Sequence, residues 1–222
     1  AVALLNSIEG YRVQFEAVFG GPATAERVGK ALASFERTIL SGASPWDYHE
    51  QARPYFDYEP DDGDDAEFRA KMRAILAAEE KHRLSESALR GRELFFGKAQ
   101  CSACHVGQDL TDESFHNLGI GMQASEPDLG RYVVTQNEKE KGAFRTPSVR
   151  NIAKTAPYMH DGSLKTLAEV VEHYAKGGTP NPWLSEKIVK LDLSAQDKQD
   201  LVTFMEEGLT GATTPVAIPR LP

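Results

Sequence analysis

The sequence has little cysteine and no long apolar run. Its 222 residues contain two cysteines, Cys101 and Cys104, which are too few for a disulfide framework of widely spread pairs. No apolar stretch approaches the ~20 residues that a membrane-spanning helix needs, so no membrane span is expected. A signal peptide is not visible either, because Ala1–Leu5 has no basic start and is too short.

Basic residues are also fewer than acidic residues. The chain has 25 Lys and Arg residues against 33 Asp and Glu residues, giving a formal net charge of −8. An acidic chain is poorly suited to bind nucleic acid or an anionic membrane, so neither is expected as a partner. A basic partner protein remains compatible with this charge. The length allows one large or two small domains with a hydrophobic core.

The two cysteines belong to one short motif, Cys101-Ser102-Ala103-Cys104-His105. Two thiols at this spacing can bond the two vinyl groups of one porphyrin, and the adjacent His105 can then bind the iron. A thioredoxin-like redox pair would need a βαβ context, and a zinc site would need a second pair of ligands. Neither is visible in the pattern. The motif therefore predicts one covalently attached haem c.

The pattern before the motif predicts helices. Residues 1–50 are expected to form one helix from about Leu4 to Phe19 and a second one that is N-capped by Thr24. Both expose apolar faces that need another packing partner. Residues 51–84 are interpreted as a linker or insertion, with an acidic loop at 59–65 and a helix over Ala66–Lys81. The loop lacks the ligand order of an EF-hand, so it is interpreted as solvated.

Residues 85–211 are predicted to form the haem domain, as in class I cytochrome c. A helix capped by Ser85 or Ser87 leads into the Cys101 turn, and a helix capped by Ser194 should cross it. Residues 212–222 contain three prolines and are interpreted as an extended tail. The predicted fold class is all-α.

Several further motifs carry a family resemblance. They are Gly91–Phe96, Phe115–Gly119, Asp128–Arg131, Phe144–Asn151 and Thr155–Gly162, together with Leu5–Tyr11 and Ala31–Thr38 near the start. The later motifs closely resemble the C-terminal haem domain of the bacterial dihaem cytochrome c peroxidase/MauG family. The two early stretches resemble the end of that family's first haem domain. The resemblance implies that residues 1–50 belong to a second, incomplete cytochrome c-like domain whose haem motif is absent here.

The resemblance also implies a function. In this family peroxide reacts at the first haem, and the present chain resembles the part with the electron-transferring haem. We therefore expect the electron-transfer haem portion of a peroxidase or MauG-like oxidoreductase that uses hydrogen peroxide and relays or stores oxidising equivalents. A second haem would come from a preceding domain or a separate chain, so the peroxide-reacting residues cannot be named. The alternative is a non-catalytic monohaem electron carrier.

The distal iron ligand has several candidates by residue type: Met122, Met159, Met205, Tyr174, His116, His160 and His173. Tyr174 shares one helix face with Leu167, Val170 and Val171, so by pattern alone it is interpreted as a core aromatic. In the peroxidases a methionine ligand lies on the helix after the Pro-Tyr-x-His segment, and in MauG-like members a tyrosine takes its place. Counting from His160, the matching residue is Tyr174. The predicted axial ligands are His105 and Tyr174.

The nature of this ligand has physical consequences. A methionine thioether is neutral and soft, and it raises the haem potential. A tyrosine phenolate is anionic and hard, so it stabilises oxidised iron and lowers the potential. Because the free phenol has a pKa of ~10, only the charge of the metal makes it a phenolate near neutral pH. Such a haem suits the storage of an oxidising equivalent.

Other residues have weaker claims. His160 is expected near the haem pocket, with a purely structural role as the alternative. Arg145 and Arg150 are expected to bind haem propionates, with surface salt bridges as the alternative. The family holds a calcium ion between its haems, and two of its main-chain carbonyl ligands match Thr155 and Pro157.

The expected partners follow from the family. They are a small redox protein as electron donor or a protein substrate, and the chain or domain with the other haem; a homodimer is a further expectation. A tryptophan on the route of MauG to its substrate corresponds to Ala99 here, so the substrate of MauG is not assumed for this chain. Because haem c is attached outside the cytoplasm, a periplasmic location is expected, with the signal peptide removed.

Overall fold

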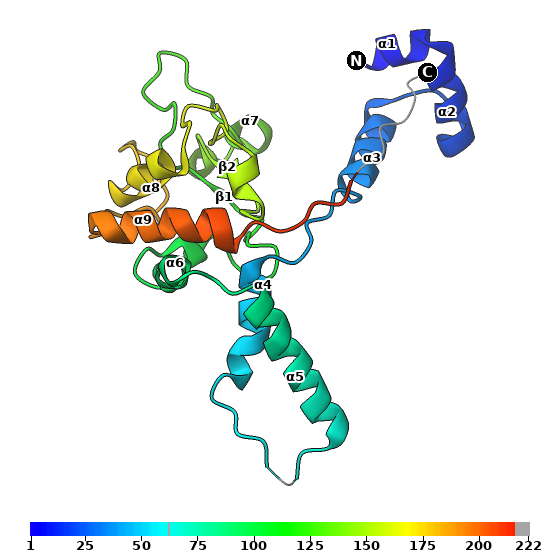
Figure 1. Ribbon diagram of the computed structural model, residues 1–222. Coiled ribbons are helices and arrows are strands. Elements are labelled where there is room, and N and C mark those ends of the chain that lie inside the picture. The colour runs from blue at the N-terminus through cyan, green and yellow to red at the C-terminus, as the bar shows by residue number, and fades with distance from the viewer. Residues whose placement is uncertain (62, 216–222) are drawn as a thin grey trace. The chain divides into compact units, whose positions relative to one another are not determined.

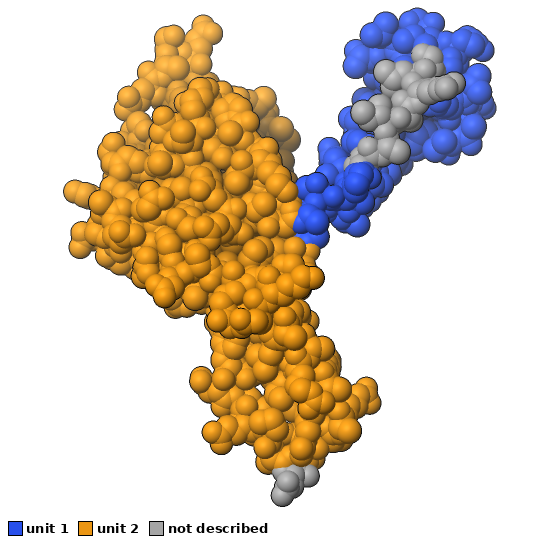
Figure 2. Space-filling view, in the orientation of Figure 1, with its two compact units in different colours: residues 1–42, 212–222 blue, residues 43–211 orange. Residues whose placement is uncertain are grey.

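The computed structural model describes residues 1–61 and 63–215, which form two compact units. Unit 1 combines residues 1–42 with the C-terminal segment from residue 212, and unit 2 comprises residues 43–211 (Figure 2). The predicted division placed boundaries after residues 50 and 84 instead. Residues 43–84 pack within unit 2 together with the segment that carries the C-x-x-C-H motif. The origin of residues 1–50 from a second cytochrome c domain stays a prediction.

Unit 1 contains three helices: α1 (Val2–Ser7), α2 (Glu9–Phe19) and α3 (Ala25–Glu36). The predicted single helix over 4–19 is interrupted at Ile8, which has an extended backbone. The Asn6 amide satisfies both backbone groups of Ala23, at 3.0 and 2.9 Å, and so ties α1 to the loop before α3. Thr24 caps α3 as predicted, accepting from the backbone N–H of Arg27 at 3.2 Å.

The helices of unit 1 expose their apolar side chains. None of the three contains a buried residue, and Leu32 and Phe35 of α3 are 56% and 49% exposed. The start of the predicted tail lies against the end of this unit, because Ser41 and Thr213 form an antiparallel bridge. The rest of the tail, residues 216–222, lies outside the described residues.

Unit 2 begins with a helical hairpin. It consists of α4 (Pro45–Ala52), a 3₁₀ turn (Arg53–Tyr55) and α5 (Ala66–Lys81), as Figure 1 shows. The predicted bounds of α5 are confirmed. Asp65 ends the acidic loop and caps α5 by accepting from the backbone N–H of Phe68 at 2.7 Å.

Two helices cross at the centre of unit 2, as the sequence predicted. They are α6 (Glu86–Phe96) and α9 (Ala195–Thr203), and α9 continues as a π-helical turn, Phe204–Gly208 (Figure 1). Ser85 caps α6 and Ser194 caps α9. Ser87, the alternative cap of α6, instead donates to the Asp200 carboxylate at 2.6 Å. It therefore joins the two helices.

The remaining elements of unit 2 are short. They are the 3₁₀ turns Cys101–Ala103, Glu138–Glu140 and Ile152–Lys154, the helices α7 (Tyr132–Thr135) and α8 (Leu167–Ala175), and the strands β1 (Phe115–His116) and β2 (Phe144–Arg145). The strands pair antiparallel, with Phe115 opposite Arg145, and the sequence pattern did not predict them. The other regular elements of the described residues are helical, which confirms the predicted class in its coarse form.

The core of unit 2 lies along the crossing of α6 and α9. Phe95, Phe204, Leu110 and Leu209 are its least exposed large apolar side chains, each at 2% or below. In the part of the chain that the structure describes, no helix is long and apolar enough to cross a membrane.

Candidate haem site

A cavity of about 530 Å³ lies in unit 2, and the C-x-x-C-H turn forms part of its wall. Phe95 of α6, Val171 of α8 and Leu201 of α9 contribute apolar side chains to the same wall. The crossing helices and α8 thus enclose a space that is mostly apolar, with the two thiols and one imidazole of the motif at its edge. This arrangement suits a large flat apolar group that is held covalently.

The two cysteines are unbridged in a tight turn. The backbone N–H groups of Cys104 and His105 both donate to the Cys101 carbonyl oxygen, at 3.2 and 3.0 Å. Burial raises the pKa of the Cys101 thiol to about 12. The reactive cysteine of a redox pair needs a lowered pKa, so this environment disfavours the thioredoxin-like alternative.

His105 is oriented by the backbone. Its Nδ1 lies 3.0 Å from the carbonyl oxygen of Leu110, so Nδ1–H donates and Nε2 is left for a metal. Burial lowers the pKa of His105, which favours the neutral form that binds iron. Leu110 itself is fully buried and has a left-handed backbone with φ of 51°. No sequence pattern indicates the role of Leu110, because this residue acts through its backbone carbonyl.

Tyr174 lines the same cavity as the thiols and His105. A capping box of Thr166 and Glu169 starts its helix, and Val170 and Val171 bury the adjacent face of α8. Burial, and then the nearby Cys101 and Cys104, raise the pKa of Tyr174. Within residues 1–61 and 63–215 its hydroxyl has no hydrogen-bond partner. A phenol without a hydrogen-bond partner, on a residue that lines the cavity, fits a ligand that an iron would complete.

The structure separates the other ligand candidates. Met159 and Met205 line the cavity, whereas Met122 and His173 do not. The sulfur of Met122 packs against Gly142, and Nε2 of His173 lies 3.0 Å from the Leu118 carbonyl oxygen. His116 and His160 also line the cavity, and both have other contacts.

His160, which was expected near a haem pocket, lines the cavity. Its ring stacks on Phe144 of β2, with 3.6 Å between ring centroids and 8° between ring planes. This contact gives the residue a packing role beside the pocket. A direct role in the chemistry stays a prediction.

The two predicted propionate partners differ in position. Arg145 lines the cavity and pairs with the exposed Glu113 at 2.7 Å. The guanidinium of Arg150 is bound by Asp47 through two 2.8 Å contacts, and its Nε donates to the Gln108 carbonyl. Arg150 is not part of the cavity lining. The propionate contacts stay predictions, and the position of Arg145 supports the one it would make.

Thr155 and Pro157 both line the cavity and are exposed. They lie on either side of Ala156 in the loop that follows the 3₁₀ turn Ile152–Lys154, and the Ala156–Pro157 peptide bond is cis. A calcium ion on their carbonyls would need further oxygen ligands. The calcium site stays a prediction.

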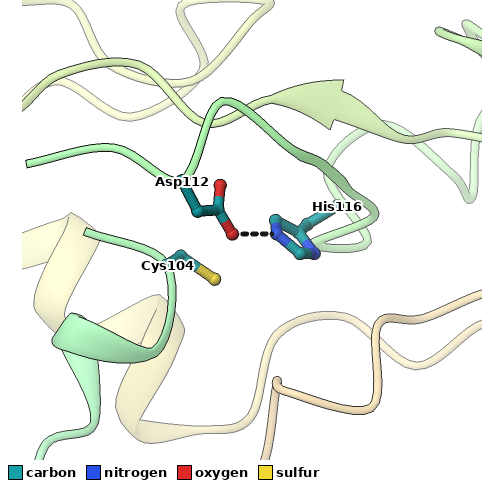
Figure 3. A group of neighbouring side chains, drawn as sticks. All are labelled: Cys104, Asp112 and His116. Atoms are coloured by element: carbon teal, nitrogen blue, oxygen red, sulfur yellow. Dashed lines mark hydrogen bonds and ion pairs between the residues drawn. The ribbon is translucent and has the colours of Figure 1, made fainter. Parts of the chain in front are cut away.

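A side-chain cluster beside Cys104 was not predicted. The ligand atoms of Cys104, Asp112 and His116 lie within 4.8 Å of one another (Figure 3). A thiol, a carboxylate and an imidazole can hold a transition metal. Here the Lys187 ammonium lies 3.1 Å from the same Asp112 oxygen that His116 contacts at 2.8 Å. The cation position at this carboxylate is thus filled by the protein, and Cys104 belongs to the haem motif.

Asp112 is charged at neutral pH. Desolvation alone would raise its pKa, but hydrogen bonds from His116, the Ser114 backbone N–H, Thr146 and Lys187 outweigh it and hold the pKa well below the usual range. Lys187 also donates to the Ala103 carbonyl at 2.7 Å, inside the C-x-x-C-H motif. Asp112 and Lys187 are 75 positions apart in sequence, so no local pattern could have paired them.

The fold and the cavity fit a c-type haem domain. Two free thiols, an imidazole with one nitrogen left for a metal, and a partnerless phenol meet in one mostly apolar cavity. The family described as di-haem cytochrome c peroxidase matches residues 1–53. With the relatives described next, this match establishes that the chain belongs to the dihaem cytochrome c peroxidase/MauG family.

The similar proteins include MauG proteins and cytochrome c peroxidases. The methylamine utilization protein MauG of Methylorubrum extorquens is 33% identical over all of this chain and 55% of its own length. The cytochrome-c peroxidase IdrP1 of Denitromonas iodatirespirans is 34% identical over 91% of this chain and 55% of its own length. The chain thus spans about half the length of these relatives.

A solved structure is also similar. It is a MauG-like protein associated with microbial copper homeostasis, with a TM-score of 0.65 and 31% identity, covering 95% of this chain and 61% of that one. This similarity supports a cytochrome c-like fold for this mostly helical chain.

Proposed function

We propose that this chain is the electron-transfer haem portion of a dihaem c-type peroxidase or MauG-like oxidoreductase that uses hydrogen peroxide. The observation that carries the proposal is the meeting of Cys101, Cys104, His105 and Tyr174 in one cavity. The membership of the family supports it, because its members include cytochrome c peroxidases and MauG. When bound, a haem at this site supplies a centre that exchanges single electrons.

The residues of the chain have separate tasks. Cys101 and Cys104 would hold the porphyrin by two thioether bonds, so the cofactor cannot leave during turnover. The Leu110 carbonyl fixes the ring of His105 and increases its basicity as a ligand. Tyr174 would give up its phenolic proton and present an anionic oxygen to the iron, which favours the oxidised state. The apolar side chains of the cavity wall would keep water away from the iron of a bound haem.

The wider assembly is part of the same proposal. The peroxide-reacting haem would lie in another domain or another chain, since the family is described as di-haem and the present sequence contains one C-x-x-C-H motif. A small redox protein would supply electrons, or a protein substrate would be oxidised. The location would be periplasmic, where haem c is attached. Main-chain carbonyls of Thr155 and Pro157 would bind calcium near the haem.

The proposal is tested on the full-length protein. Intact mass under denaturing conditions gives the number of covalent haems, and absorption and EPR spectra follow the protein after addition of hydrogen peroxide. We expect a second covalent haem in the protein or in a tightly associated chain, and a peroxide-dependent change at both haems. One haem in total, with spectra that peroxide leaves unchanged, would support the electron-carrier alternative and overturn the proposal.

A further inference from the structure

One short segment serves both the proximal histidine and a buried charge. Leu110 accepts the hydrogen bond of His105 through its carbonyl oxygen at 3.0 Å. Two residues later, Asp112 places its carboxylate beside Cys104, as Figure 3 shows. The side chain of Asp112 is only 13% exposed. The backbone that orients the iron ligand therefore also fixes an anion next to the second attachment cysteine.

The carboxylate is held from several sides. One oxygen accepts from the Ser114 backbone N–H at 2.9 Å, and the other contacts His116 Nε2 at 2.8 Å and Lys187 Nζ at 3.1 Å. Nδ1 of His116 lies 3.4 Å from the Ser185 hydroxyl. Nε2–H of His116 donates to the carboxylate, whose oxygens can only accept. The lysine of this network is Lys187, and its ammonium pairs with Asp112.

The two charges differ in exposure and in reach. The Lys187 side chain is 42% exposed, so water screens the ammonium more than it screens the carboxylate. Lys187 also contacts the motif itself, through the Ala103 carbonyl at 2.7 Å. Lys187 lines the haem cavity, and the Asp112 carboxylate lies beside Cys104 at the edge of that cavity. Charges at such an edge alter the relative stability of ferric and ferrous haem, because the two states differ by one unit of charge.

We propose that Asp112, held between His116 and Lys187 beside Cys104, lowers the reduction potential of the haem carried by this chain, and that Lys187 opposes it. The inference rests on the proposed function only in placing a haem at Cys101, Cys104 and His105. Asp112 acts through the electric field and is a tuning residue. It complements the anionic ligand proposed at Tyr174, since both favour the oxidised state that a stored oxidising equivalent requires.

The test is a redox titration of the full-length holoprotein, followed by EPR so that haems with different ligands are resolved. The variants are Asp112→Asn, Lys187→Met and the double variant, and intact mass confirms the haem in each. Asp112→Asn is expected to increase the ferrous-to-ferric ratio at a fixed potential about tenfold, which corresponds to about 59 mV for one electron. Lys187→Met is expected to change it in the opposite direction, and the double variant to lie between the two.

A matched control is Lys190→Met, which removes another exposed lysine three positions along the same segment and should leave the potential unchanged. Shifts of the same sign in Asp112→Asn and Lys187→Met, or no shift in either with haem present, would overturn the inference. If Asp112→Asn does not retain haem, the Lys187→Met variant still tests the inference, because its reduction potential is expected to fall. A holoprotein with these shifts but no response to peroxide would overturn the proposed function alone.

Discussion

The main-chain oxygen of Asp200 in α9 lies so close to Gly91 in α6 that a Cβ atom on residue 91 would be 1.9 Å from it. A carbon and an oxygen that are not bonded cannot approach this closely, so the crossing requires glycine. Helix α6 also contributes Phe95 to the wall of the cavity, and α9 contributes Leu201. The absence of one side chain thus sets the distance between two walls of the site.

Gly91→Ala should destabilise unit 2. The added methyl group meets backbone rather than a flexible side chain, so the helices must separate, and we expect a loss of about 3 kcal/mol in the free energy of unfolding. Denaturant unfolding monitored by circular dichroism measures it. The matched control is Gly29→Ala in α3, where nothing lies within 4 Å of the new Cβ. That variant should be neutral or more stable by about 0.5–1 kcal/mol, because alanine favours a helix. Equal unfolding midpoints for wild type and Gly91→Ala would contradict the expectation.

The Asp200 carboxylate should make stability depend on pH. Its side chain is 3% exposed and accepts hydrogen bonds from Arg90 at 2.8 Å and Ser87 at 2.6 Å. The hydrogen bond from Arg90 is the main cause that holds the pKa of Asp200 well below its usual range, against the effect of desolvation. A carboxyl group whose pKa is lowered by folding stabilises the protein above its unfolded pKa of ~3.9, and this stabilisation is lost as the pH falls toward the folded value.

A comparison of the unfolding free energies of wild type and Asp200→Asn checks the direction of this pH dependence. Arg90 is about half exposed, so the difference in unfolding free energy at pH 7 should be about 2 kcal/mol. We expect it to be constant between pH 7 and 5 and to shrink below about pH 4. Asp192→Asn, at an exposed position, is the control and should show no such difference. A difference that grows on acidification would refute the assignment.

Tyr174→Phe should alter the haem without releasing it. The variant keeps the ring and removes the oxygen, while both cysteines remain, so the intact mass should still include haem. The ferric absorption and EPR spectra should change, and the reduction potential should rise because an anionic ligand is lost. Tyr158→Phe is the control, because Tyr158 lines the same cavity but its hydroxyl donates to the Ile152 carbonyl at 3.2 Å. Its spectra should match those of the wild type.

The opposite result would assign the ligand elsewhere. Met159 and Met205 also line the cavity. Unchanged spectra in Tyr174→Phe, together with changed spectra in Met159→Leu or Met205→Leu, would identify a methionine ligand. The potential would then fall in the methionine variant, since a thioether favours ferrous iron.

Arg150→Lys should loosen the hairpin from the rest of unit 2. The guanidinium binds Asp47 of α4 through two 2.8 Å contacts and lies 5.3 Å from the Trp46 ring centroid. A lysine cannot reproduce the paired contacts or the planar stacking, so we expect a loss of about 1–3 kcal/mol and faster hydrogen exchange in α4. Arg145→Lys is the control, because its exposed pair with Glu113 should contribute less than about 1 kcal/mol. Equal exchange in α4 for both variants would contradict the role of Arg150.

The haem motif and most helix starts could be predicted because they depend on neighbouring residues. Thr24, Ser85 and Ser194 cap the helices assigned to them, since a cap bonds to a backbone N–H group three positions along. The break at Ile8 was missed because it depends on Asn6 reaching Ala23, 17 positions away. For the same reason the pattern could not show that residues 43–50 pack with unit 2.

The sequence by itself determined the chemistry available to this protein: two thiols and an imidazole at the spacing of haem c, and a tyrosine on a helix face beside them. The tertiary structure alone decided which groups act together. It turned the Leu110 carbonyl toward His105, placed Tyr174 on the wall of the cavity, bound Arg150 to Asp47 and placed Lys187 against Asp112. These pairings depend on backbone groups and on residues far apart in the chain, because hydrogen bonds and charges act over distances in space, which local patterns do not specify.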